Sequence, residues 1–114
     1  MVRTLDRKDC AMLHLVLKRK WYDMIERGEK KEEYRSYDVW CKRITKWLHR
    51  FNTNPQIRHL VVAFQRGYTK PSMWFDVFCV ASEQAIGREE THPEWGEPDT
   101  PHYVISLGER VVLE

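Results

Sequence analysis

The stretch that follows the first amphipathic run is Gly28-Glu29-Lys30-Lys31-Glu32-Glu33-Tyr34-Arg35, with the pattern Gly-x-Lys-x-x-Glu-x-Arg. A glycine at the end of a helical run can take the positive φ that ends a helix, after which the chain leaves in an extended direction. In a strand, alternate side chains share a face, so Glu33 lies beside Arg35 and Glu32 beside Tyr34. Lys30 lies in the turn, where its ammonium can reach Glu33. We therefore expect a Lys/Glu/Arg cluster at the edge of the fold.

Strand and helix patterns alternate along the first half of the chain. Residues 11–17 (AMLHLVL) are compatible with a buried strand. Residues 18–27 have apolar side chains at helical spacing and predict a short helix that ends at Gly28. A second helix is expected after Asp38, its predicted N-cap. Its apolar positions fall at i, i+4, i+7, i+8 and i+11, namely Trp40, Ile44, Trp47, Leu48 and Phe51.

Strand patterns dominate the second half of the chain. Residues 57–64 predict a buried strand, and residues 73–81 predict a longer one with aromatic side chains on both faces. Loops are expected at residues 65–72 and 87–101, and residues 102–107 and 110–113 are strand-like around Gly108. The order β-α-β-α-β-β-β predicts an α+β fold, a small mixed β-barrel with two flanking helices.

Charge is distributed unevenly although the net charge is only +2. Residues 1–50 carry fourteen Lys/Arg and eight Asp/Glu, whereas residues 51–114 carry five and nine. A basic half can attract polyanions, but charges that interdigitate on folding remove this polarity. The same two alternatives hold for the second helix, whose polar face is either a solvated surface or part of a phosphate-binding one. That face consists of Lys42, Arg43, Lys46, His49 and Arg50.

With 114 residues, the chain is expected to form a single domain over residues 11–114, preceded by a flexible N-terminal leader at residues 1–10. No apolar run reaches the roughly 20 residues needed to span a bilayer, and the charged N-terminus is unlike a secretory signal. We expect a cytoplasmic protein without a membrane partner; its oligomeric state stays open.

Cys10, Cys41 and Cys79 are expected to be reduced thiols, with Cys79 in the core.

No pattern in the chain indicates a metal or cofactor site. The histidines lack an i, i+4 helical pairing and a cysteine partner at ligand spacing. The glycines are few and scattered, unlike a loop that cradles phosphate. We therefore predict neither a metal nor a cofactor.

Three further segments accompany the Gly-x-Lys-x-x-Glu-x-Arg motif: LHLVLKRKWYDMIERG, which ends on its Gly28, and VVAFQRGY and HYVISLG after it. Together with the motif they resemble an ASCH domain of the PUA-like superfamily, from about Leu13 to the C-terminus. The resemblance implies a PUA-like β-barrel with a cationic cleft, between barrel and helices, for RNA or modified nucleosides. Carried over by position, Gly28 has a structural role, and the cleft is lined by Lys30, Glu33 and Arg35, with Gln65, Arg66 and Tyr68 on the facing loop.

The resemblance favours an RNA- or modified-nucleotide-binding domain. In this interpretation Lys30, Arg35 and Arg66 hold phosphate, with Lys70 adding a further cation on the same loop. Glu33 accepts a hydrogen bond from a base or orients Arg35. Tyr68 stacks on a base. The structural alternative is an ion pair of Glu33 with a neighbouring cation that staples the turn to the barrel.

Two other functions stay open at this point. Some members of the family are amidohydrolases that remove the acetyl group of N4-acetylcytidine with a Lys, a Thr nucleophile and a Glu. Here Lys30 matches the lysine, and Glu33 stands in the nucleophile's position, where it can act only as a general base toward water. The third possibility is a protein-interaction module that uses the acidic loop at residues 89–99.

Overall fold

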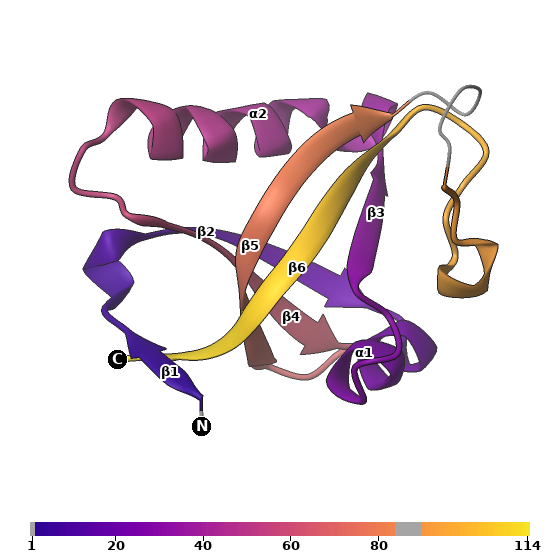
Figure 1. Cartoon of the computed structure of the whole chain (residues 1–114), viewed down its shortest axis with the longest axis horizontal. Coiled ribbons are helices and arrows are strands. Elements are labelled where there is room, and N and C mark those ends of the chain that lie inside the picture. Colours follow the sequence, from indigo (N-terminus) through magenta and orange to yellow (C-terminus); the bar gives the residue numbers. More distant parts are fainter. Residues whose placement is uncertain (1, 84–89) are drawn as a thin grey trace.

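The computed structural model describes residues 2–83 and 90–114. Figure 1 shows a curled mixed sheet that forms a half-barrel, together with two α-helices. The elements are β1 Arg3–Leu5, η1 Arg7–Asp9, β2 Cys10–Leu17, α1 Arg19–Glu26, β3 Glu32–Ser36, α2 Tyr37–Thr53, β4 His59–Arg66, β5 Pro71–Glu83, η2 Pro93–Trp95 and β6 His102–Leu113. The predicted α+β class and the mixed sheet flanked by two helices are thus confirmed.

The sheet has two open edges that matter for the site. Its strand order is β1-β6-β5-β4-β2, and β3 pairs with β6 off this path. β1–β6 and β2–β4 are parallel, whereas the other pairs are antiparallel. Among the described strands, β2 pairs only with β4, and β3 pairs only with β6. The sheet therefore does not close by backbone pairing between β2 and β3.

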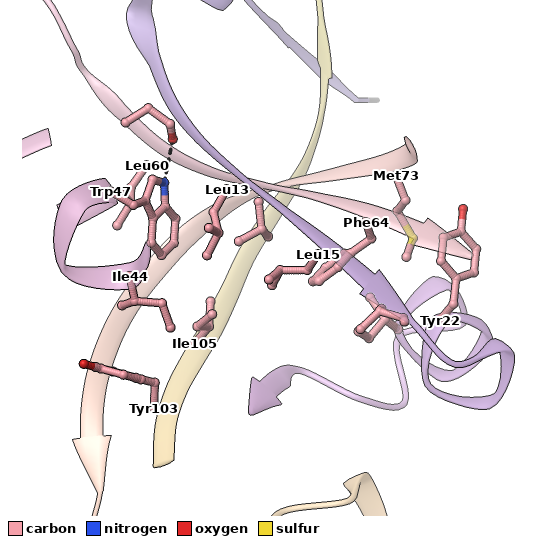
Figure 2. Packing of buried hydrophobic residues seen from close by; sticks show 14 of the residues in the cluster. Leu13, Leu15, Tyr22, Ile44, Trp47, Leu60, Phe64, Met73, Tyr103 and Ile105 are labelled. Carbon is pink, nitrogen blue, oxygen red and sulfur yellow. Dashed lines mark hydrogen bonds between the residues drawn. The ribbon is translucent and has the colours of Figure 1, made fainter. Parts of the chain in front are cut away.

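The core packs the sheet against both α2 and α1 (Figure 2). β2 alternates strictly at its end, so Leu13, Leu15 and Leu17 are buried while the residues between them are exposed. Ile44 and Trp47, on the apolar stripe of α2, pack into the same cluster. The Trp47 Nε1 donates a hydrogen bond to the Ala11 carbonyl at 2.9 Å, which anchors α2 to β2. Full burial of each such apolar side chain contributes about 1.5–3 kcal/mol.

Several local expectations agree with the structure and several do not. α1 ends at Glu26, and Gly28 has a φ of 79°, as its role at the helix end requires. Asp38 is not the N-cap: α2 begins at Tyr37, its N-cap is Ser36, and no side chain caps it. Cys79 is exposed and not in the core, since β5 turns it outward. Residues 3–5, expected in a flexible leader, form β1, where Leu5 is buried against β6.

The C-terminal strands predicted on either side of Gly108 are one strand, β6. The Cβ of any other residue at Gly108 would lie 2.8 Å from the Asp76 carbonyl oxygen, so glycine permits the close approach of β5. In the expected 87–101 loop, residues 87–89 lie outside the described residues, and Pro93–Trp95 form η2. No helix in the described ranges has the length and apolar character needed to cross a membrane.

Candidate functional site: a polar pocket at the seam of the half-barrel

A hollow of about 240 Å³ lies where the end of β2 approaches β3, and we call it the seam pocket. The Arg35 Nη2 bridges this seam by donating to the Val16 carbonyl at 3.0 Å. The segment that contains η2 forms a third wall; Figure 1 shows it beside β3. The pocket is lined by Val16, Leu17, Lys18, Trp21, Glu33, Tyr34, Arg35, Ser36, Trp95 and Gly96.

The motif side chains form a continuous polar chain beside this pocket. The Lys30 Nζ lies 3.4 Å from the Glu33 Oε1. The Arg35 Nε and Nη2 both donate to the Glu33 Oε2, at 2.9 and 2.6 Å. The opposite face of β3 carries the bond from the Tyr34 hydroxyl to Glu32, at 2.8 Å. The alternation inferred from the sequence therefore holds, and Glu33 is held between two cations.

Lys30 lies deeper than the sequence indicates. Its side chain is only 1% exposed, and it is not among the residues that line the seam pocket. The ammonium donates to the Trp95 carbonyl at 2.7 Å and lies 4.5 Å from the centre of the Tyr34 ring. Burial lowers the pKa of Lys30 because desolvation disfavours the charged form, and the nearby Glu33 carboxylate opposes this shift. The buried Lys30 ammonium thus links Glu33 of the motif to Trp95 of the η2 segment.

The lowered pKa of Lys30 predicts a pH-dependent stability. At pH values between the folded-state pKa and the ordinary value of 10.5, the unfolded chain binds more protons at Lys30 than the folded chain does. The free energy of unfolding contributed by this residue therefore rises with pH across that window. In urea unfolding from about pH 7 to about pH 10, the stability of the wild type relative to Lys30→Met should increase. A difference that stays flat or falls would contradict the assignment.

A buried pair of His102 and Glu97 holds the η2 segment beside the seam. The His102 Nε2 lies 3.0 Å from the Glu97 Oε2, and both side chains are at most 3% exposed. The other ring nitrogen faces the Thr100 carbonyl at 2.6 Å, and this oxygen can only accept. The Glu97 Oε1 accepts from the His92 backbone N–H at 2.7 Å. One carboxylate therefore ties both ends of the loop that carries Trp95.

Two tryptophans give the pocket its flat apolar walls. Trp21 comes from α1 and Trp95 from η2. Gly96 has a φ of 83°, and a Cβ there would lie 2.7 Å from the Trp21 ring, so glycine allows the η2 segment to approach Trp21 closely. His92 stacks on Trp95 with ring centres 3.9 Å apart. Rings of this kind can hold a planar ligand.

The 65–70 turn is only partly joined to the motif. The Arg66 Nε and Nη2 pair with Asp23 of α1 at 2.9 and 3.1 Å. The Gln65 side chain contacts His14 at 2.9 Å and the Gly67 carbonyl at 2.8 Å. Both side chains are therefore occupied by structural contacts.

Tyr68 is fully exposed at the tip of the turn. It lines a second hollow of about 520 Å³ that shares Val16, Leu17 and Lys18 with the seam pocket. Lys70 lines a different hollow, near His14. Of the turn residues expected to bind, Tyr68 is thus the one that lies next to the seam pocket.

The sequence alone did not point to Lys18, Trp95, Glu97 or His102 as site residues. Lys18 directly follows β2, and a cation at the end of a predicted strand is the only sequence feature that could have indicated a binding role for it. Trp95 lies in a loop of prolines and acids, where an isolated tryptophan without a helical or strand pattern has no evident core role. The pairing of Glu97 with His102 depends on the path of the loop, for which there is no local pattern.

In the described part of the chain, no group of three or more His, Cys, Asp or Glu side chains is arranged to hold a metal ion. Comparison with protein-family models, curated proteins and solved structures finds no significant match to this chain. The family assignment therefore depends on the motif and on the order of elements, and it stays a prediction.

Proposed function

We propose that this chain is an RNA- or modified-nucleotide-binding domain of the ASCH type with a PUA-like fold. The observation that carries the proposal is the Lys30–Glu33–Arg35 chain beside a polar pocket with tryptophan walls. A half-barrel with two helices is compatible with such a fold. The charged groups and the flat rings converge on one small pocket, which is the arrangement that a nucleotide needs.

Each part of a nucleotide has a suitable partner in the seam pocket. The Glu33 carboxylate has acceptor sites beyond those used by Lys30 and Arg35, and it can accept from an amino or imino group of a base. Arg35 and the exposed Lys18 lie at the same pocket and can bind phosphate, the first as a planar fork and the second as a point charge. Trp21 and Trp95 can stack on the base, a contact worth about 1–3 kcal/mol in single-strand binders.

The roles proposed for the other candidate residues follow from their contacts. Lys30 orients Glu33 and the Trp95 carbonyl, since its ammonium is buried behind the pocket. Arg66 positions α1 through Asp23. Tyr68 extends the stacking surface at the neighbouring hollow. Gln65 shapes the turn that presents it.

Arg35→Ala should weaken the binding of a nucleoside monophosphate at least tenfold. The variant removes a guanidinium from the pocket, and a charge-assisted hydrogen bond contributes about 1.5–3 kcal/mol. Titration of cytidine monophosphate, followed by tryptophan fluorescence, measures the affinity at low and high salt. Arg27→Ala is the matched control because Arg27 is exposed and pairs only with Glu29 in the described chain. The proposal would be refuted if Arg35→Ala and Arg27→Ala lost the same affinity for cytidine monophosphate. It would also be refuted if the affinity of the wild type were the same at low and high salt.

The second candidate is an amidohydrolase acting on a modified nucleoside such as N4-acetylcytidine. The observation that favours it is the buried Lys30, whose pKa is lowered and whose ammonium contacts the Glu33 carboxylate. Such a pair suits proton transfer, with Glu33 as a general base toward water. Incubation with N4-acetylcytidine, read by mass spectrometry, tests it: cytidine formed by the wild type and not by Lys30→Met establishes an enzyme. The absence of cytidine leaves the binding function in place.

A further inference from the structure

We propose that the seam pocket takes its nucleotide from single-stranded RNA, whose phosphates lie on a basic surface formed by α2 and the open edge of β2. The inference rests on the proposed function and narrows its ligand from a free nucleotide to a strand. The basis is a group of Lys and Arg residues that do not line the seam pocket.

Residues 39–75 contain no Asp or Glu, so all seventeen acidic residues of the chain lie outside this segment. The same segment carries seven Lys or Arg residues. It includes most of α2, all of β4 and the turn to β5. A segment with cations and no carboxylates creates a positive potential, which opposes compact folding and attracts polyanions.

Four of the seven cations of this segment line two hollows that share lining residues. Arg43, Lys46 and Arg50 recur at helical spacing on α2, are exposed, and line a hollow of about 370 Å³ against β2. A neighbouring hollow of about 400 Å³ shares Met12 and His14 with the first and is lined also by Arg7 and Lys70. Within the described residues, no ion pair joins any of these five cations to a carboxylate. We call Arg43, Lys46 and Arg50 the α2 basic row.

Trp40 joins the seam pocket to the α2 basic row. The guanidinium groups of Arg35 and Arg43 lie 4.8 and 4.5 Å from the centre of its ring. Each also donates from Nη2 to a carbonyl of β2, Arg35 to Val16 at 3.0 Å and Arg43 to His14 at 3.4 Å. Those carbonyls are two residues apart on one strand, or about 6.6 Å. The pocket arginine and the first arginine of the row are therefore held close together along the open edge of β2.

A row of cations that continues from a nucleotide pocket fits a strand better than it fits a free nucleotide. A monophosphate is satisfied by Arg35 and Lys18, which line the pocket. The following phosphates of a strand would find Arg43, Lys46 and Arg50 in order along α2. The strand is single because the bases of a duplex are stacked and paired, and a base must leave the stack to enter a pocket.

The experiment compares cytidine monophosphate with a ten-nucleotide single-stranded RNA of mixed sequence, each titrated against wild type and variants over a range of salt. The Lys46→Gln/Arg50→Gln double variant should bind the oligonucleotide roughly tenfold more weakly and lower its salt slope by about 1.4, since each lost phosphate contact in a single strand accounts for about 0.7. Its affinity for the monophosphate should equal that of the wild type. Arg110→Gln is the matched control for Arg50→Gln, because Arg110 is exposed on β6 and lines neither hollow.

The outcomes separate this inference from the function on which it rests. If the monophosphate binds and the oligonucleotide binds no more tightly, the strand is excluded and the nucleotide pocket is retained. If Arg50→Gln weakens oligonucleotide binding no more than Arg110→Gln does, the basic row is not the path of the strand. If neither ligand binds to the wild type, the proposed function fails, and the inference fails with it.

Discussion

Glu33→Ala should destabilise the protein by about 3–5 kcal/mol, because it removes the shared partner of two cations while they stay in place. The Lys30 side chain is 1% exposed and the Arg35 side chain 14% exposed, so neither gains full hydration in return. For a domain of this size, such a loss lowers the melting temperature by roughly 10 °C or more. Thermal melts followed by circular dichroism measure the change.

Glu32→Ala is the control for this substitution, since Glu32 is the adjacent glutamate on the opposite face of β3. Its carboxylate accepts from the partly buried Tyr34 hydroxyl, and the loss of such a hydrogen bond costs about 1 kcal/mol. Lys30→Met separates charge from packing, because it removes the buried cation and leaves Glu33 paired with Arg35. If Glu33→Ala and Glu32→Ala have the same melting temperature, contacts other than those of the Glu33 carboxylate hold Lys30 and Arg35 in place.

Glu97→Ala should loosen the segment that carries Trp95 and abolish nucleotide binding at the seam. The change leaves the buried His102 Nε2 and the partly buried His92 N–H without the Glu97 carboxylate oxygens that they contact, at a cost of about 1–3 kcal/mol for each group. Trp95 then no longer holds its carbonyl against the Lys30 ammonium. Hydrogen exchange over residues 90–101 should become faster than in the wild type, and the fluorescence response to cytidine monophosphate should be lost.

Glu94→Ala tests whether this effect depends on the buried pair. Glu94 lies in η2, three residues before Glu97, and its exposed carboxylate contacts the His92 ring at 3.0 Å. An exposed pair of this kind contributes little to stability. Equal exchange rates in the two variants would mean that the loop is held over the seam by other contacts than the Glu97–His102 pair.

Local patterns of the chain are informative where the contacting residues are near one another in the sequence. The alternation in β3 predicted that Glu33 lies beside Arg35 because side chains two apart in a strand share a face. The apolar spacing in α2 predicted the buried Ile44 and Trp47 for the equivalent reason at helical period. Asp38 fits the N-cap preference near a helix start, yet the chain enters α2 directly from β3, and Ser36, the last residue of β3, is the N-cap.

The depth of Lys30 illustrates what a local pattern leaves open. The motif places its ammonium near Glu33, which the structure bears out at 3.4 Å. Its burial depends on Trp95, which lies 65 residues further along the chain and accepts its hydrogen bond. The same holds for Arg66, whose partner Asp23 lies on another element, 43 residues away. Exposure is a property of the assembled fold, so the spacing of a motif does not determine it.

The sequence by itself determined the α+β class, the positions of both helices, the glycine that ends α1 and the polar triplet of the motif. Each depends on contacts between residues near one another in the chain, where the periods of helix and strand apply. Only the tertiary structure decided that β2 and β3 stay unpaired and that Arg35 bridges this seam. The same holds for Arg43, which links α2 to β2, and for the buried pair of Glu97 and His102 that holds the η2 loop beside the seam. These features join residues distant in sequence, whose approach is set by the curl of the sheet and by core packing.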